Sequence, residues 1–137
     1  MHRRVFGTSE KLNVGENSRF WQSLDHMVAA SRLIVDRPEG SPHPRHPSFV
    51  YPLNYGCLEG THSTDGDGID VWIGSLPDRR LTAIICTVDL DQQDAELKLL
   101  LGCTSQEAQT ALNVHNTGNQ AGMLIERQAA GGAAIHD

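Results

Sequence analysis

Positive charge and cysteine are both scarce in this chain of 137 residues, and each shortage narrows what the protein can do. The 11 Lys and Arg against 17 Asp and Glu leave a formal net charge of -6. This balance argues against nucleic acid or an anionic membrane as a partner, because both attract clustered positive charge. The three cysteines are odd in number and lack CxxC spacing, so reduced thiols in a cytoplasmic protein are expected. No apolar run reaches the length that spans a bilayer.

The signatures of several common catalytic sites are also missing. The chain contains no GxSxG elbow, no GxxxxGK[ST] loop and no GxGxxG turn, so a serine nucleophile, a P-loop and a dinucleotide site have no basis in the sequence. Seven histidines raise the question of zinc, but His43 and His46 lie in a proline-rich loop without a cysteine nearby. We expect these histidines to be ordinary loop or surface residues.

The apolar pattern predicts one folded domain between two irregular ends. Residues 1–18 are polar and unpatterned and are expected to form a loose leader. Residues 19–127 should form the domain, and the Ala- and Gly-rich residues 128–137 a disordered tail.

Within that domain the pattern predicts short strands with a helix at each end. One helix is expected at 19–33 with Ser18 as its N-cap, and another behind the capping box formed by Thr104 and Glu107. Four prolines exclude a helix from residues 36–50. Strand candidates lie at 33–35, 49–51, 69–73, 82–88, 95–101 and 123–125. A small barrel or a tightly curled sheet is the expected architecture.

Three carboxylates fall within six residues in the run Asp65-Gly66-Asp67-Gly68-Ile69-Asp70. Two carboxylates about 4 Å apart repel by ~4 kcal/mol at a protein surface, so such a cluster needs a cation or a shared proton. Mg²⁺ is the natural ion for oxygen ligands. The plain alternative is an acidic turn, because Asp caps turns readily. A calcium loop of EF-hand type is disfavoured, since Leu76 stands where a bidentate glutamate is needed.

A second charged group follows in the pattern Asp91-x4-Glu96-x-Lys98. Spacing of two residues in a strand directs Glu96 and Lys98 to one face. Lys98 stands out because Lys11 is the only other lysine of the chain. Taken alone, the pattern is more typical of a solvated strand face with an ion pair.

Together these segments resemble family I soluble inorganic pyrophosphatases. The run Tyr51-Pro52-Leu53-Asn54-Tyr55-Gly56 and the acidic run from Asp65 to Val71 are similar to the YPxNYG and DGDPxDV signatures of that family. The group ending in Lys98 is similar to its D-x4-D-x-K element, with Glu96 in place of the second aspartate. The resemblance covers residues 33–101. It implies a mainly β, α+β fold: a small five-stranded OB-like barrel with flanking α-helices.

The resemblance also implies an activity, which is Mg²⁺-dependent hydrolysis of pyrophosphate to two phosphates, with Mn²⁺ as an alternative ion. Asp67 would be the general base, and Tyr55 would help to orient it. Because enzymes of the family assemble into oligomers, exposed apolar residues such as Trp72 are candidates for a homo-oligomer interface. The implied metal ligands are Asp65, Asp70, Asp91, Glu96 and Asp36, and the implied substrate-binding residues are Lys98, Arg45, Tyr51 and Arg37.

Several positions depart from the family pattern. Gly68 replaces its proline, which is expected to loosen the acidic loop. If Arg45 matches the family's phosphate-binding lysine, Pro47 falls on a family glutamate; alternatively, Arg37 matches an arginine on a hairpin that this chain lacks. The family's Tyr-Lys pair falls near His115-Asn116, without its cation.

Three functions therefore remain open. The protein is an active pyrophosphatase, a protein that binds metal and a phosphate ligand without turnover, or a hydrolase of another phosphoanhydride or phosphoester.

Overall fold

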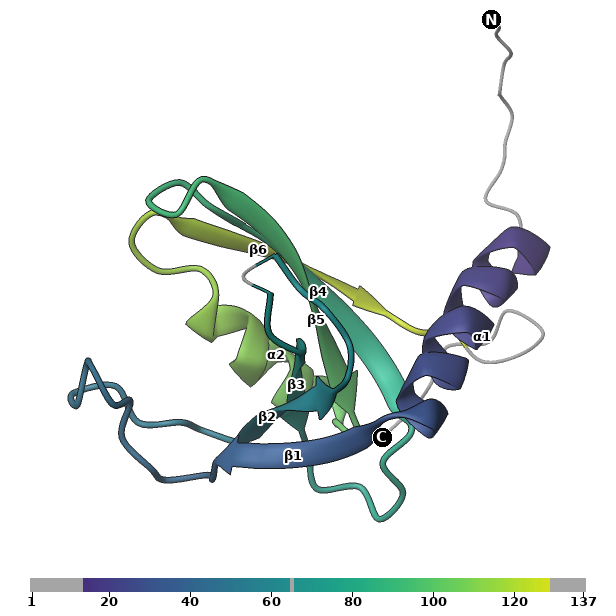
Figure 1. Cartoon of the computed structure of the whole chain (residues 1–137), viewed down its shortest axis with the longest axis horizontal. Helices are drawn as coiled ribbons and strands as arrows, with labels where there is room; N and C mark the ends of the chain where they lie inside the picture. The colour runs from purple at the N-terminus through teal and green to yellow at the C-terminus, as the bar shows by residue number, and fades with distance from the viewer. Residues whose placement is uncertain (1–13, 65, 129–137) are drawn as a thin grey trace, which may run out of the picture.

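The computed structural model describes residues 14–64 and 66–128, which form a six-stranded sheet and two helices (Figure 1). This mainly β architecture confirms the predicted OB-like α+β fold class. The elements are α1 Val14–Ala30, β1 Arg32–Arg37, β2 Asn54–Glu59, β3 Ile69–Ile73, β4 Leu81–Asp89, β5 Asp94–Leu101, α2 Ser105–Val114 and β6 Gln120–Glu126. None of the helices in this described part is long and apolar enough to cross a bilayer.

The described chain has six strands, where the family resemblance implies a five-stranded barrel, and the main difference from the strands predicted by pattern lies around the YPxNYG-like run. Residues 49–51 are not a strand of the sheet: Val50 forms an isolated β-bridge with Pro42, and the backbone of Tyr51 bonds to Gly40 and Ser41 in the same loop. The strand is instead β2, which the sequence analysis did not predict. Asn and Gly are poor strand formers, but β2 needs Gly56, because any side chain there would collide with the backbone carbonyl of Ile34 in β1.

The helices differ in how well they were predicted. The capping box of α2 is confirmed: Glu107 N donates to Thr104 Oγ1 at 3.1 Å, and Thr104 N donates to Glu107 Oε1 at 2.9 Å. Helix α1 begins at Val14 rather than at residue 19, so Ser18 lies inside the helix and not at its N-cap.

The strand order is β1-β2-β3-β5-β4-β6, and the one parallel pair, β3 with β5, determines where the charged residues lie. Val71 pairs with Leu99 in this ladder. Side chains alternate along both strands, so the preceding residues, Asp70 and Lys98, emerge side by side on the same face.

Two cores cover the two faces of the sheet. In Figure 1 the sheet curls around α2, whereas α1 lies outside it. The core on the α2 side contains Tyr51, Leu53, Trp72, Ala83, Ile85, Leu100, Cys103, Ala108 and Ala111, and the core on the α1 side contains Leu24, Leu58, Val71, Ile73, Leu81, Ile84, Leu99 and Leu101. Trp72 is only 1% exposed, so the expectation that it marks an exposed interface is wrong.

Arg127, which directly follows β6, links this strand to helix α1 through side-chain contacts. Its guanidinium forms two hydrogen bonds of 2.8 Å with the Asp25 carboxylate and lies 5.5 Å from the centroid of the Trp21 ring. The paired geometry and the aromatic contact make this a stronger link than an ordinary surface ion pair.

We predict that Arg127→Met lowers the free energy of unfolding by about 1–2 kcal/mol, because it removes the ion pair with Asp25 and the contact with Trp21 that add to the packing of α1 on the sheet. Urea denaturation followed by circular dichroism measures this loss. Arg32→Met is the matched control, since Arg32 is exposed and lies 3.7 Å from Glu59 in an open surface pair; its effect should stay within about 0.5 kcal/mol. Equal losses in the two variants would contradict this account of α1.

Candidate active site

The centre of the site is the ammonium group of Lys98, which two carboxylates share. Its Nζ lies 2.9 Å from Asp70 Oδ2 and 3.0 Å from Glu96 Oε1. Asp70 comes from β3 and Glu96 from β5, so the cluster joins two segments that are far apart in the sequence. Lys98 is 8% exposed, which is unusual for a lysine and requires that its charge be paired.

The two carboxylates hold this lysine in its charged form. Burial alone would lower the pKa of Lys98, but the neighbouring charges and hydrogen bonds of Asp70 and Glu96 outweigh it and raise the pKa above its ordinary value. The ammonium is therefore a fixed positive charge at neutral pH.

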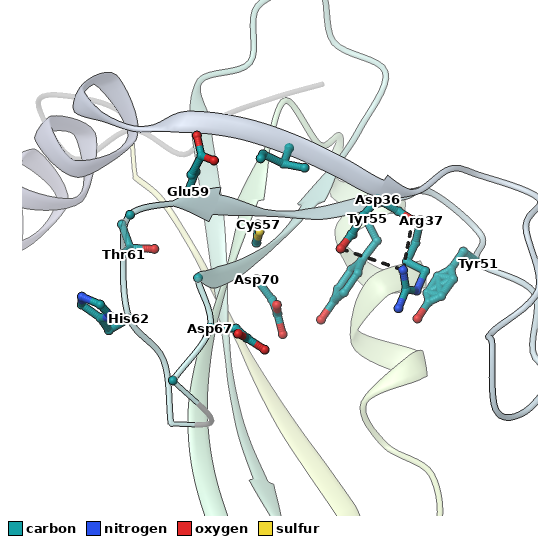
Figure 2. Close-up of a pocket in the computed structure, with 14 residues that line it drawn as sticks. Asp36, Arg37, Tyr51, Tyr55, Cys57, Glu59, Thr61, His62, Asp67 and Asp70 are labelled. Atoms are coloured by element: carbon teal, nitrogen blue, oxygen red, sulfur yellow. Dashed lines mark hydrogen bonds and ion pairs between the residues drawn. The ribbon is translucent and has the colours of Figure 1, made fainter.

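A pocket of about 640 Å³ opens beside this cluster, between β1, β2 and the acidic loop (Figure 2). Asp70 is the residue that the pocket and the Lys98 cluster have in common. The other charged or polar side chains that line the pocket are Asp36, Arg37, Tyr51, Tyr55, Cys57, Glu59, Thr61, His62 and Asp67. With Asp70 included, four carboxylates line the pocket against the single guanidinium of Arg37, so the pocket favours a bound cation.

An irregularity in β1 brings two charges of opposite sign to the same pocket. Val35 pairs with Gly56 and Arg37 with Tyr55, so Asp36 is an extra residue in a β-bulge. The bulge allows both Asp36 and Arg37 to line the pocket although they are adjacent in the strand. Figure 2 shows the Arg37 guanidinium between Tyr55 and Tyr51, on the side opposite Asp67.

Tyr55 interacts with Asp70. Burial, followed by the charge of Asp70 and a hydrogen bond to its carboxylate, raises the pKa of Tyr55 far above its ordinary value. The phenol therefore stays protonated and donates to Asp70. Its ring is fixed by an edge contact with Trp72, with the centroids 4.6 Å apart.

The pocket contains a cysteine, Cys57, that is a poor nucleophile. Burial and the charges of Asp36, Asp70, Asp67 and Glu59 raise the pKa of this thiol. Since the thiolate is the reactive form, Cys57 is kept in its inert form at neutral pH. Any nucleophile in this pocket is better supplied by solvent.

The acidic loop is held by hydrogen bonds of its own. Both the backbone N–H and the hydroxyl of Ser63 donate to the Asp67 carbonyl, at 2.8 and 3.0 Å, and the Thr64 hydroxyl donates to the Ala95 carbonyl of β5 at 3.1 Å. A Cβ on Gly68 would lie 2.5 Å from the Leu58 carbonyl oxygen, so this position needs glycine for a close backbone approach. Asp65 lies outside the described residues.

Two of the predicted site residues lie away from the pocket. Asp91 is in the β4–β5 turn, where its Oδ1 accepts a hydrogen bond of 2.9 Å from Asn119 Nδ2. Arg45 is exposed on the loop between β1 and β2, which extends away from the sheet in Figure 1. Neither residue lines the pocket.

Conversely, Cys57, Glu59 and His62 line the pocket but were not predicted. Cys57 and Glu59 lie two and four residues after Tyr55 in β2. If this strand had been predicted, the alternation of its side chains would have placed Tyr55, Cys57 and Glu59 on one face.

The pair His115-Asn116, which falls near the family's Tyr-Lys pair, does not line the pocket. His115 is buried beneath the site, where its Nε2 accepts a hydrogen bond of 3.0 Å from Trp72 Nε1. Its Nδ1 therefore carries the proton, which it donates to Gln120 Oε1 at 2.6 Å. Gln120 Nε2 in turn donates to Asp89 Oδ2 at 3.1 Å.

The donor set suits a hard divalent ion, although it is incomplete in the described residues. Among residues 14–64 and 66–128 no three His, Cys, Asp or Glu side chains lie close enough to hold a metal ion. Asp70 and Glu96 nevertheless offer carboxylate oxygens that already share one cation, Lys98 Nζ. Oxygen-only donors of this kind fit Mg²⁺ or Mn²⁺ rather than zinc, which favours nitrogen and sulfur.

Comparison with known proteins supports the fold. No protein-family model and no curated protein matches the sequence. Among solved structures, an inorganic pyrophosphatase from Neisseria gonorrhoeae matches with a TM-score of 0.51 and 18% sequence identity. The match covers 65% of this chain and 77% of the other. The chain therefore has a pyrophosphatase-like fold; at this identity the match shows the fold alone.

We predict that acid weakens the fold through His115. Burial lowers the pKa of this imidazole in the folded protein, and the nearby Lys98 charge acts in the same direction, against the Gln120 hydrogen bond. The unfolded chain therefore binds the proton first, and stability falls as the pH drops below about 6.5, by at most about 1.4 kcal/mol per pH unit.

Urea unfolding between pH 7.5 and 5.5 measures this slope. His115→Gln removes this titrating group and should reduce the slope. A slope in His115→Gln equal to that of the unsubstituted protein would show that another group is responsible.

Proposed function

We propose that this protein is a divalent-metal-dependent hydrolase of inorganic pyrophosphate that acts in the cytoplasm. The observation that supports this most strongly is the shared contact of Asp70 and Glu96 with Lys98 at the edge of an acidic pocket, in a chain with a pyrophosphatase-like fold. Acidic oxygens for a metal and a cation for a phosphate are the two requirements for binding a metal–phosphate complex.

Asp70 and Glu96 are the residues best placed to hold Mg²⁺, and Asp65 and Asp36 are candidates for further ligands. Asp91 would contribute only if it leaves Asn119 and approaches the pocket. A bound Mg²⁺ would lower the pKa of a coordinated water and offset the negative charge of the phosphates. The chain supplies the rest: Tyr55 orients the Asp70 carboxylate, and the β3–β5 ladder fixes Asp70 against Glu96.

Asp67 is our candidate for the general base. Its carboxylate points into the pocket beside Asp70 in Figure 2, and its backbone is fixed by Ser63. Water is the expected nucleophile, because the environment of Cys57 suppresses its thiolate. A carboxylate in this position would accept the proton of the attacking water.

Arg37 and Lys98 are our candidates for the phosphate-binding cations, with Tyr51 at the pocket wall. In the described chain the Arg37 guanidinium lies 3.9 Å from the Asp36 carboxylate and donates a hydrogen bond of 3.1 Å to the Asp36 carbonyl. Both contacts are exposed, so they are easily exchanged for a phosphate. Arg45 would contribute only if its loop approaches the pocket when substrate binds.

The pocket volume favours a second candidate function, the hydrolysis of a larger phosphoanhydride or phosphoester. About 640 Å³ falls within the range of pockets for ligands of drug size. A panel of nucleoside diphosphates and sugar phosphates distinguishes the two candidates: a higher kcat/KM for any of them than for pyrophosphate would favour the larger substrate.

We predict that Asp67→Asn lowers kcat for phosphate release from magnesium pyrophosphate by ~10²–10⁴, because the amide cannot accept the proton of water. A colorimetric phosphate assay with and without Mg²⁺ measures the loss. Asp78→Asn, a change of the same kind at an exposed surface pair with Arg80, is the matched control and should keep full activity.

Unchanged turnover in Asp67→Asn would exclude Asp67 as the base. If the unsubstituted protein binds pyrophosphate in calorimetry but releases no phosphate from any compound in the panel, the protein binds its ligand without turnover and the hydrolase proposal fails.

A further inference from the structure

Lys98 lies at the point where a metal ion would be expected. Its ammonium is within 3.0 Å of one oxygen of Asp70 and one of Glu96, the two carboxylates best placed to be metal ligands. The side chains of Lys98, Glu96 and Asp70 are 10%, 14% and 30% exposed. Water therefore screens this cluster poorly, and its carboxylates need a counterion at all times.

The same oxygens cannot serve an ammonium and a divalent ion at full strength. A carboxylate oxygen that coordinates Mg²⁺ lies close to the ion, and an ammonium at the same place would be repelled by it. Binding of a metal by Asp70 and Glu96 therefore requires Lys98 Nζ to move. Lysine suits such a movement, because its charge sits at the end of a flexible four-carbon stem and can shift without a change in the backbone.

The displaced ammonium would remain beside the pocket. Lys98 emerges from β5 next to Asp70, and Asp70 itself lines the pocket. An ammonium that leaves these carboxylates needs another negative partner, and the phosphate groups of a substrate are the anions that the proposed function brings there. A single movement would thus open the metal site and supply a cation to the substrate.

The geometry points to Lys98 as a built-in counterion of the metal-free site, which a divalent cation displaces toward the substrate phosphate. The inference rests on the proposed function, because it requires a divalent ion at Asp70 and Glu96. It adds an order of events: the metal binds first, and the phosphate contact of Lys98 forms afterwards. It also explains how these carboxylates are tolerated in the folded protein before a metal arrives.

The lysine content of the chain makes a direct test of the unsubstituted protein practical. Lys98 and Lys11 are the only lysines, so an amine-reactive acetylating reagent followed by peptide mass spectrometry reports on Lys98 with Lys11 as the internal reference. We expect Lys98 to be protected without metal, and saturating Mn²⁺ at constant ionic strength to raise its modification rate relative to Lys11 at least about fivefold.

Manganese binding is measured in the same samples by electron paramagnetic resonance, so that two failures can be told apart. If Mn²⁺ binds and Lys98 remains protected, this inference is overturned and the proposed function stands. If Mn²⁺ does not bind, the metal requirement of the proposed function fails together with the inference.

A substitution provides an independent readout. Lys98→Gln removes the competing charge and should tighten Mn²⁺ binding at pH 8 by at least about tenfold, although turnover falls because the phosphate contact is lost. Arg80→Gln changes the net charge equally at an exposed residue that pairs with Asp78, and should leave the affinity unchanged. Unchanged or weaker Mn²⁺ binding in Lys98→Gln would overturn the inference. If that variant does not fold, the labelling of the unsubstituted protein decides.

Discussion

The site depends on the parallel pairing of β3 with β5. The other ladders of the sheet are antiparallel, and only this one is parallel; it places two distant segments in register, with Asp70 beside Lys98. The buried ammonium then holds Asp70 and Glu96 at a common point. Removing one partner of such a buried group leaves an unpaired charge, which destabilises a protein by ~3–5 kcal/mol. Fold and site are consequently stabilised by the same contacts.

Much of the fold could be predicted from local patterns. The alternation of β3, the apolar run of β4 and the capping box of α2 each reflect contacts within a few residues, and all three occur in the structure. Strand β2 was missed because Asn and Gly disfavour strands locally, while Gly56 is required by the close approach of β1. Trp72 was misjudged because its burial depends on α2 and His115, which are distant in the sequence.

The part of the candidate site that depends on local spacing could also be predicted from the sequence. Glu96 and Lys98 share a face through strand spacing alone, and the structure brings Asp70 to them. Spacing could not reveal that Asp91 bonds to Asn119, or that a bulge brings Asp36 into the pocket, because both depend on tertiary contacts. Spacing also could not reveal that the ammonium of Lys98 already neutralises Asp70 and Glu96, the carboxylates for which a metal ion was predicted.

A double-mutant cycle between Asp70→Asn and Lys98→Gln tests most directly whether these residues act as one unit. Urea unfolding of the two single variants and the double variant gives the coupling in the free energy of unfolding. Our account predicts that the double variant is more stable than the sum of the single effects implies, by at least about 1 kcal/mol, since Lys98→Gln leaves two carboxylates without their cation and Asp70→Asn removes one of them. Effects that add to within about 0.5 kcal/mol would contradict it.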